Sequence, residues 1–135
     1  MKATREENIE VAQTGINAFI NGNMEGLLDV CAEDIVWSTH QNPDVPFAKT
    51  YKGKEGARQF LNDLADNVAF SVFSPEKYYS DDDMVFVKTH QVAKVKSTGK
   101  TYDHQMLMTF KIKHGKVSEF FAYVDSADQG RAFTN

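Results

Sequence analysis

The clearest alternation of hydrophobic and polar side chains in the chain lies in residues 101–125. Side chains alternate between the two faces of a strand, so this pattern predicts a strand with one buried and one exposed face. His114 and Gly115 predict a tight turn, because glycine accepts the positive φ of hairpin turns, and residues 117–125 alternate again. The stretch therefore predicts a long antiparallel hairpin with a single histidine on its apolar face. On the first strand that face holds Tyr102, His104, Met106, Met108, Phe110 and Ile112.

Three other stretches repeat apolar residues every three or four positions, which is the period of a helix. Thr4 and Glu7 form a capping-box pattern before the first stretch, which ends at Gly22. Asn23 is placed to cap a second, shorter helix, and residues 54–67 predict a third. We expect the apolar stripes of these helices to pack in the core. The stripes consist of Ile9, Ala12, Ile16 and Phe19, then Leu27, Leu28 and Cys31, then Ala57, Phe60, Leu61 and Leu64.

Strands of period two are also predicted at residues 35–40, in the VAFSVF segment that begins at Val68, and at residues 84–96. The segment QNPDVPFAKTYKG contains two prolines and predicts a loop. The acidic run 81–83 predicts a solvated turn rather than a metal site, because three adjacent carboxylates cannot all face one ion. Residues 97–100 predict the turn that leads into the long hairpin.

This order of elements predicts one α+β domain spanning residues 1–135, with three N-terminal helices on one face of an antiparallel sheet. The opposite face keeps an apolar set of side chains. Such a patch favours association, most simply as a two-fold homodimer. Its residues are Met84, Phe86, Val92, Leu107, Phe121 and Tyr123.

Composition and charge narrow the possible partners. The net charge is −4, with 25% charged residues and no basic stripe, which disfavours nucleic-acid binding. No apolar run is long enough to span a membrane, and MKATREENIE lacks the apolar segment of a signal peptide. Cys31 is the single cysteine, so no internal disulfide can form. We therefore expect a cytoplasmic protein with neither a membrane nor a nucleic-acid partner.

Three segments resemble the NTF2-like superfamily, and within it the SnoaL-like and ketosteroid-isomerase-like proteins. The resemblance covers nearly the whole chain. It implies a strongly curved sheet wrapped around helices into an NTF2-like (cystatin-like) cone, with a pocket at the open end and homodimers through the outer sheet face. The segments are AFINGNMEGLLDVCAEDIVW, TYKGKEGARQFLNDL and TGKTYDHQMLMTFKIKHGKVSEFFAYVDSA.

The catalytic positions implied by this resemblance carry residues that cannot perform the known chemistry. In the steroid isomerases, a tyrosine and a protonated aspartic acid stabilise an enolate oxyanion. These positions fall on Gly15 and Met108, which have no proton to donate. The proton-moving aspartate falls near Thr39, whose hydroxyl is too weakly acidic, and the polyketide cyclase acid falls on Ala122. The Arg and two Asp of the epoxide hydrolases have no match, so none of these mechanisms carries over.

His104 is the first candidate for acid–base chemistry, because a half-buried histidine titrates near neutrality. The competing interpretation is a core histidine whose polar atoms are simply satisfied. His40, beside the Pro-rich loop, is a second candidate, although its parity differs from that of Trp37 and Thr39. Asp125 is a third, with backbone hydrogen bonding as its alternative role.

The remaining chemistry-bearing residues suggest neither a metal nor a cofactor. His90 and His114 are expected at the surface, and no pair of histidines or cysteines has metal-ligand spacing. Glycine-rich phosphate loops and G-x-S-x-G elbows are also missing from the sequence. We therefore expect any reaction to proceed without a cofactor.

A pocket for a small, largely hydrophobic molecule bearing a carbonyl or hydroxyl is expected, since such sites are concave and apolar with few polar points. Two functions stay open. One is an isomerase- or cyclase-type enzyme that works by proton transfer with His104 as base. The other is a non-catalytic ligand-binding or dimeric scaffold module. The expected pocket wall is Trp37, Thr39, Phe60, Leu64, Met106, Met108, Phe120, Ala122 and Val124.

Overall fold

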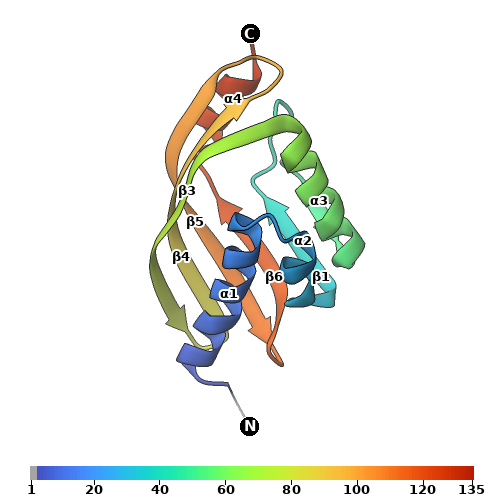
Figure 1. The fold of residues 1–135 in the computed structure, drawn as a ribbon, viewed down its shortest axis with the longest axis vertical. Coiled ribbons are helices and arrows are strands. Elements are labelled where there is room, and N and C mark those ends of the chain that lie inside the picture. The colour runs from blue at the N-terminus through green and yellow to red at the C-terminus, as the bar shows by residue number, and fades with distance from the viewer. Residues whose placement is uncertain (1–2) are drawn as a thin grey trace.

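The computed structural model describes residues 3–135, and within them four helices accompany a six-stranded sheet (Figure 1). This arrangement confirms the predicted α+β class. The helices are α1 (Arg5–Ile20), α2 (Met24–Asp29), α3 (Gly53–Asn67) and α4 (Ser126–Phe133). The strands are β1 (Cys31–Thr39), β2 (Thr50–Lys52), β3 (Val68–Asp81), β4 (Met84–Val95), β5 (Thr101–Lys113) and β6 (Lys116–Tyr123).

The N-terminal helices begin where their capping residues predict. The Thr4 side chain accepts the Glu7 amide at 3.1 Å, and the Glu7 carboxylate accepts the Thr4 amide at 2.9 Å. Asn23 accepts the Gly26 amide at 2.9 Å and so starts α2. Both caps satisfy amides that have no partner inside the helix, and the predicted capping box is confirmed.

The sheet has the strand order β2-β1-β6-β5-β4-β3, and it curves around α1 and α3 (Figure 1). All neighbours are antiparallel except β1 and β6, which run parallel with Trp37 opposite Phe120. The expectation of a purely antiparallel sheet is wrong at this pair. Parallel neighbours need a long crossover, and here the chain from β2 to β5 lies between them in sequence.

Two elements were absent from the sequence prediction. Strand β2 is only three residues long and lies in the Pro-rich segment predicted as a loop. Helix α4 occupies the chain's end, where β6 stops at Tyr123 instead of continuing to Asp125. Asp125 caps this helix by accepting the Asp128 amide at 3.0 Å. Both elements are too short to show a repeated apolar period.

Strand β3 departs from simple alternation. Its register with β4 shifts between Phe70 and Val72 and again between Pro75 and Lys77. Such bulges add a residue on one strand and reverse the faces of the residues that follow. Phe70 and Phe73, expected on opposite faces, therefore both contact the interior, where their rings lie 5.4 Å apart.

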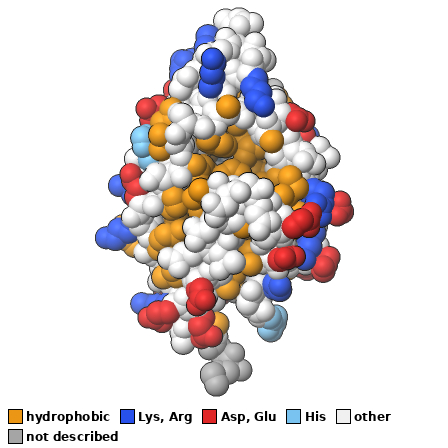
Figure 2. Space-filling model, viewed as in Figure 1, with side chains coloured by type: hydrophobic (Ala, Val, Ile, Leu, Met, Phe, Trp, Pro, Cys, Tyr) orange, Lys and Arg blue, Asp and Glu red, His pale blue; other side chains and the backbone are white. Residues whose placement is uncertain are grey.

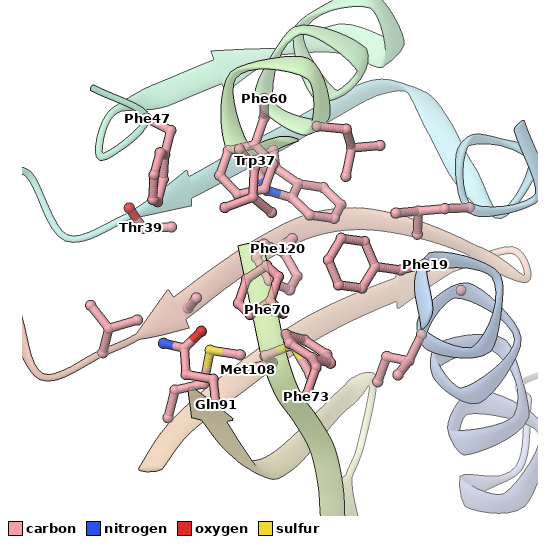
Figure 3. A pocket seen from close by; sticks show the side chains of 18 of the residues that line it. Phe19, Trp37, Thr39, Phe47, Phe60, Phe70, Phe73, Gln91, Met108 and Phe120 are labelled. Carbon is pink, nitrogen blue, oxygen red and sulfur yellow. The ribbon is translucent and has the colours of Figure 1, made fainter. Parts of the chain in front are cut away.

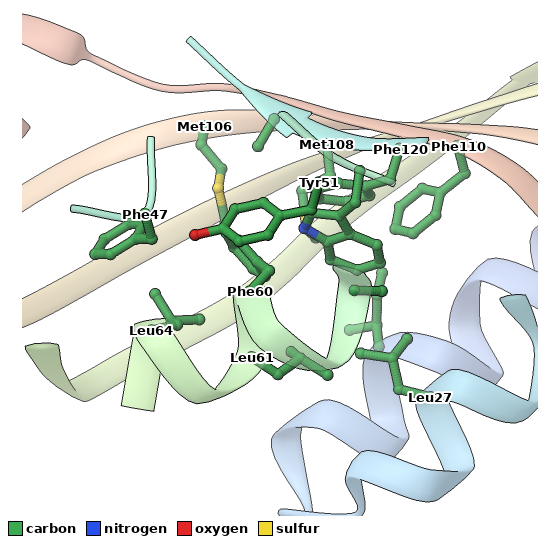
Figure 4. Close-up of a cluster of buried hydrophobic side chains, with 14 of the residues drawn as sticks. Leu27, Phe47, Tyr51, Phe60, Leu61, Leu64, Met106, Met108, Phe110 and Phe120 are labelled. Carbon is green, nitrogen blue, oxygen red and sulfur yellow. The ribbon is translucent and has the colours of Figure 1, made fainter. Parts of the chain in front are cut away.

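The hydrophobic core lies between the helices and the concave face of the sheet (Figure 4). Phe110 is 2% exposed, and its ring meets that of Phe120 edge-on at 5.1 Å. Cys31 is buried, and burial raises the pKa of its thiol to about 11, so the thiol stays protonated at neutral pH. No helix among residues 3–135 has the length and apolar character needed to cross a membrane.

Candidate functional site

A cavity of about 70 Å³ lies between the helices and the inner face of the sheet (Figure 3). Its lining residues Phe19, Phe70, Phe73 and Val124 are only half-buried, so they mark the side where it meets solvent. Figure 2 shows hydrophobic side chains gathered in the middle of this helix-bearing face, with charged side chains around its margins. The cavity therefore sits beneath an apolar surface.

The structure places every predicted wall residue on this cavity. They come from β1, α3, β5 and β6 and from the residues just after β6, because the alternate positions of the strands share the concave face. These residues are Trp37, Thr39, Phe60, Leu64, Met106, Met108, Phe120, Ala122 and Val124. The lining residues that the prediction did not include are Gly15, Ile16, Phe19, Leu27, Phe47, Leu61, Phe70, Phe73, Gln91, Tyr102, Phe110 and Gln129.

Aromatic rings form the largest part of the wall. Trp37 stacks on Phe120 with ring centroids 4.0 Å apart and tilts against Phe60 at 5.4 Å. Phe47 contacts Phe60 edge-on at 6.1 Å. These rings fix one side of the cavity, whereas Met106 and Met108 give the other side flexible, adaptable side chains.

Polar groups of the wall gather at one end. Figure 3 shows Thr39 and Gln91 on the side of the cavity away from α1. The Thr39 hydroxyl makes only a long hydrogen bond of 3.4 Å to the His40 carbonyl. Within residues 3–135, the Trp37 indole N–H and the Tyr102 hydroxyl are buried without a hydrogen-bond partner. None of the lining residues carries a charge at neutral pH.

Tyr102 stands at this polar end with only 1% of its surface exposed. Burial raises the pKa of its hydroxyl to about 12; the nearby Gln129 amide opposes this shift, and Asp128 adds to it. Tyr102 therefore remains protonated and can act as a hydrogen-bond donor, but it is not a base at neutral pH.

His104 lies directly behind the wall, because Gln91 of β4 stands opposite it in the sheet. Its side chain is 6% exposed. Nε2 lies 2.9 Å from the Gln91 Nε2 atom, and Nδ1 lies 3.0 Å from Asp128 Oδ2. Both ring nitrogens are thus occupied, so His104 supports Gln91 and reaches the cavity only if Gln91 moves.

Asp128 of α4 joins three parts of the chain. Oδ2 accepts the Asp103 amide at 3.1 Å and His104 Nδ1 at 3.0 Å, while Oδ1 accepts from Arg131 at 2.8 Å. Burial alone would raise the pKa of this carboxyl, but the hydrogen bonds from Arg131, His104 and the Asp103 amide together lower the pKa below its ordinary value. Asp128 is therefore ionised at neutral pH.

The other two candidate residues do not reach the cavity. The His40 ring packs edge-on against Phe121 at 5.4 Å and Tyr123 at 5.5 Å. Those two residues have the opposite parity to Phe120 and Ala122, so His40 lies on the outer face of the sheet. Asp125 serves as the cap of α4, which corresponds to the structural alternative for this residue.

The remaining histidines lie apart from the cavity. His90 contacts the Asp103 carboxylate at 2.7 Å on the outer side of the sheet, and His114 occupies a turn with φ of 53°. Across residues 3–135, no three His, Cys, Asp or Glu side chains are arranged to hold a metal ion.

One signal in the sequence could have identified Gln91. It has the same parity on β4 as Val85, Val87 and Ala93, so it is a polar side chain on a buried face. Buried polar groups need partners, which marks such a position for attention. Asp128 and Gln129 gave no comparable signal because α4 itself was not predicted.

Comparisons with known proteins agree with this architecture. A structure of an NTF2-like protein from Burkholderia xenovorans LB400 is 26% identical, covers 97% of this chain and 98% of its own, and has a TM-score of 0.89. TerC, co-crystallised with polyporic acid, is 18% identical with a TM-score of 0.84 over 94% of this chain and 98% of its own. A candidate polyketide cyclase from Xanthomonas campestris pv. campestris is 17% identical with a TM-score of 0.80 over 98% and 100% of the two chains.

No curated protein matches the sequence. The family model of the SnoaL-like domain matches residues 12–120, which includes α2, α3 and strands β1 to β5 in full. The fold, the cavity at its concave face and this match lead to one assignment. The chain belongs to the SnoaL-like domain family and has the NTF2-like fold.

Proposed function

We propose that the protein binds a small, uncharged and largely hydrophobic molecule in the cavity, without a cofactor. The observation that carries this proposal is a buried wall of aromatic and aliphatic side chains that contains a few neutral polar groups and no charge. Burying an ion without a partner is costly, whereas a neutral molecule loses little on entering such a site. The fold neighbour TerC was crystallised with polyporic acid, so a protein of this fold accommodates a small organic molecule.

The cavity must widen to admit such a ligand. Its volume of about 70 Å³ is below the roughly 300–1,000 Å³ that is usual for small-molecule sites. Met106 and Met108 are the wall residues with the most rotatable side chains, and Phe70 and Phe73 are half-buried at the edge. We expect these side chains to shift when a ligand enters, while the stacked Trp37 and Phe120 stay in place.

Trp37 gives a specific test, because it is the only tryptophan of the chain and lines the cavity. Adding toluene to ¹⁵N-labelled protein is expected to shift the single indole N–H resonance saturably. Ala122→Leu places three extra carbons in the cavity and is expected to weaken toluene binding at least tenfold. Ala65→Leu, the same change at an exposed position of α3, is expected to leave it unchanged. An unresponsive wild-type resonance, or unaltered binding by Ala122→Leu, contradicts the proposal.

Proton transfer on a bound carbonyl compound is the second candidate function. It is favoured by the buried Asp128–His104 pair, with 3.0 Å between Oδ2 and Nδ1, directly behind Gln91. If a ligand displaces the Gln91 amide, His104 Nε2 can take a proton from the carbon beside the carbonyl and return it, with Asp128 stabilising the imidazolium. This makes an isomerase- or cyclase-type step possible without a cofactor.

Deuterium exchange separates this enzyme from a binding module. In D₂O, catalysis is expected to exchange the methyl hydrogens of acetophenone faster than buffer does. His104→Ala should abolish the acceleration, whereas His90→Ala, which alters a histidine of the outer face, should preserve it. Binding of acetophenone with no accelerated exchange identifies a non-catalytic module.

We further propose that the protein forms a homodimer through the outer face of the sheet, in the cytoplasm, where a free thiol such as that of Cys31 persists. Tyr123 is 49% exposed and extends an apolar cluster with Phe121 and His40. Sedimentation velocity is expected to show a dimer that Tyr123→Arg dissociates. Ile20→Arg, at a 48% exposed position of α1, should remain dimeric. A monomeric wild type contradicts this proposal.

A further inference from the structure

The hydrogen bonds behind the wall determine which atom of Gln91 faces the cavity. Asp128 is ionised, and a carboxylate can only accept hydrogen bonds. His104 Nδ1, at 3.0 Å from Asp128 Oδ2, must therefore carry the hydrogen. A neutral imidazole has one N–H, so His104 Nε2 is left as an acceptor.

Gln91 completes the chain from the other side. Its amide nitrogen lies 2.9 Å from His104 Nε2 and donates to it. The Tyr102 ring stacks on the imidazole, with centroids 5.4 Å apart at 20°, and helps to hold it in place. The direction of the Gln91 amide is thus set by partners on two other elements, β5 and α4.

The Gln91 amide oxygen then points toward the interior of the cavity (Figure 3). The residue is only 3% exposed, and its oxygen has no hydrogen-bond partner within residues 3–135. A buried acceptor that lacks a partner carries a free-energy cost that a donor on a ligand removes. A site with such a group discriminates strongly against ligands that lack the matching donor.

We propose that Gln91, oriented by His104 and Asp128, is a specificity-determining residue that selects neutral ligands carrying a hydroxyl or N–H hydrogen-bond donor. This rests on the proposed ligand-binding function. It adds the chemistry of the ligand's polar end: a hydroxyl-bearing aromatic or alicyclic molecule, with the donor at the Gln91 end and the apolar part toward α1. The neighbouring Thr39 and Tyr102 hydroxyls can pair with the same polar end.

Phenol and toluene test this inference, because they have nearly the same shape and differ in the hydroxyl donor. Their affinities can be compared by following the Trp37 indole resonance during titration. Gln91→Met keeps the length of the side chain and removes the acceptor. The ratio of phenol to toluene affinity is expected to fall roughly tenfold in this variant. Gln13→Met, the same change at an exposed position of α1, is expected to preserve the ratio.

The possible outcomes are distinct. If neither probe binds the wild type, the proposed function fails and this inference fails with it. If both bind but Gln91→Met leaves the ratio unchanged, or if Gln129→Met lowers it instead, only the inference is overturned. Should Gln91→Met not fold, the wild type alone decides. Phenol must then bind at least as tightly as toluene despite its better-hydrated hydroxyl, and a preference for toluene overturns the proposal.

Discussion

Replacing Phe110 by alanine is expected to lower the free energy of unfolding by about 3–5 kcal/mol, which is the usual cost of deleting a buried ring. Phe110 is 2% exposed and contacts Phe120, whose other contact is the stacked Trp37. Because Phe110 also lines the cavity, its loss enlarges the existing space. The surrounding sheet positions on β5 and β6 are hydrogen-bonded and cannot collapse to fill it.

Urea unfolding followed by circular dichroism measures this change. The matched control is Ile20→Ala, which truncates a 48% exposed residue of α1 and is expected to cost less than about 1 kcal/mol. Toluene is expected to stabilise Phe110→Ala more than the wild type, since the enlarged cavity accepts it without displacing side chains. Similar stability for Phe110→Ala and the control would show that this core is not packed as described.

The second large effect is expected for Asp128→Ala, which removes hydrogen bonds to the Asp103 amide, His104 and Arg131. We expect a loss of about 2–3 kcal/mol, because hydrogen bonds to charged groups are strong but not additive, and this carboxylate is partly exposed. The variant also leaves His104 Nδ1 without its acceptor. Gln91 then loses its fixed orientation, so the preference for phenol should weaken together with stability.

The pH dependence of stability separates this effect from a simple packing loss. The folded-state pKa of Asp128 lies below its ordinary value. Its contribution is therefore fully present above the unfolded value of about 3.9 and is lost as the pH falls through the lower folded value. Wild type and Asp128→Ala should converge in stability over that acidic range. Asp66→Ala, which removes an exposed carboxylate from α3, should run parallel to the wild type, and a parallel course for Asp128→Ala would contradict the network.

The strand faces could be predicted from the sequence wherever alternation is unbroken. Met106 and Met108 on β5 share the parity of Phe110, and the structure places all three on the cavity. Capping residues likewise fixed where α1 and α2 begin. These features depend on local chemistry, which a single sequence contains.

Bulges and strand order could not be predicted in this way. The register shift after Phe70 brings Phe73 to the same side, which simple alternation excludes. The parallel pairing of β1 with β6 depends on how the whole chain closes. Short elements such as α4 have too few turns for a periodic signal, so Asp128 and Gln129 were missed with it.

The role of His104 shows the same limit at the site. Its parity correctly indicated the concave face, since its neighbours Tyr102 and Met106 line the cavity. Only the register of β4 against β5 shows that Gln91 stands between the imidazole and the cavity. Periodicity predicts which face a side chain occupies, whereas pairing between strands decides what shields it.

A crystal structure with 4-bromophenol would test ligand binding in the cavity most directly, because bromine is located unambiguously by its anomalous scattering. We expect the bromine within the cavity, beside Trp37 and Met108, with the hydroxyl roughly 2.7 Å from the Gln91 amide oxygen. Met106 and Met108 should have changed rotamer to make room. A bromine site elsewhere, with the cavity side chains unmoved at the same concentration, would contradict the proposed binding function.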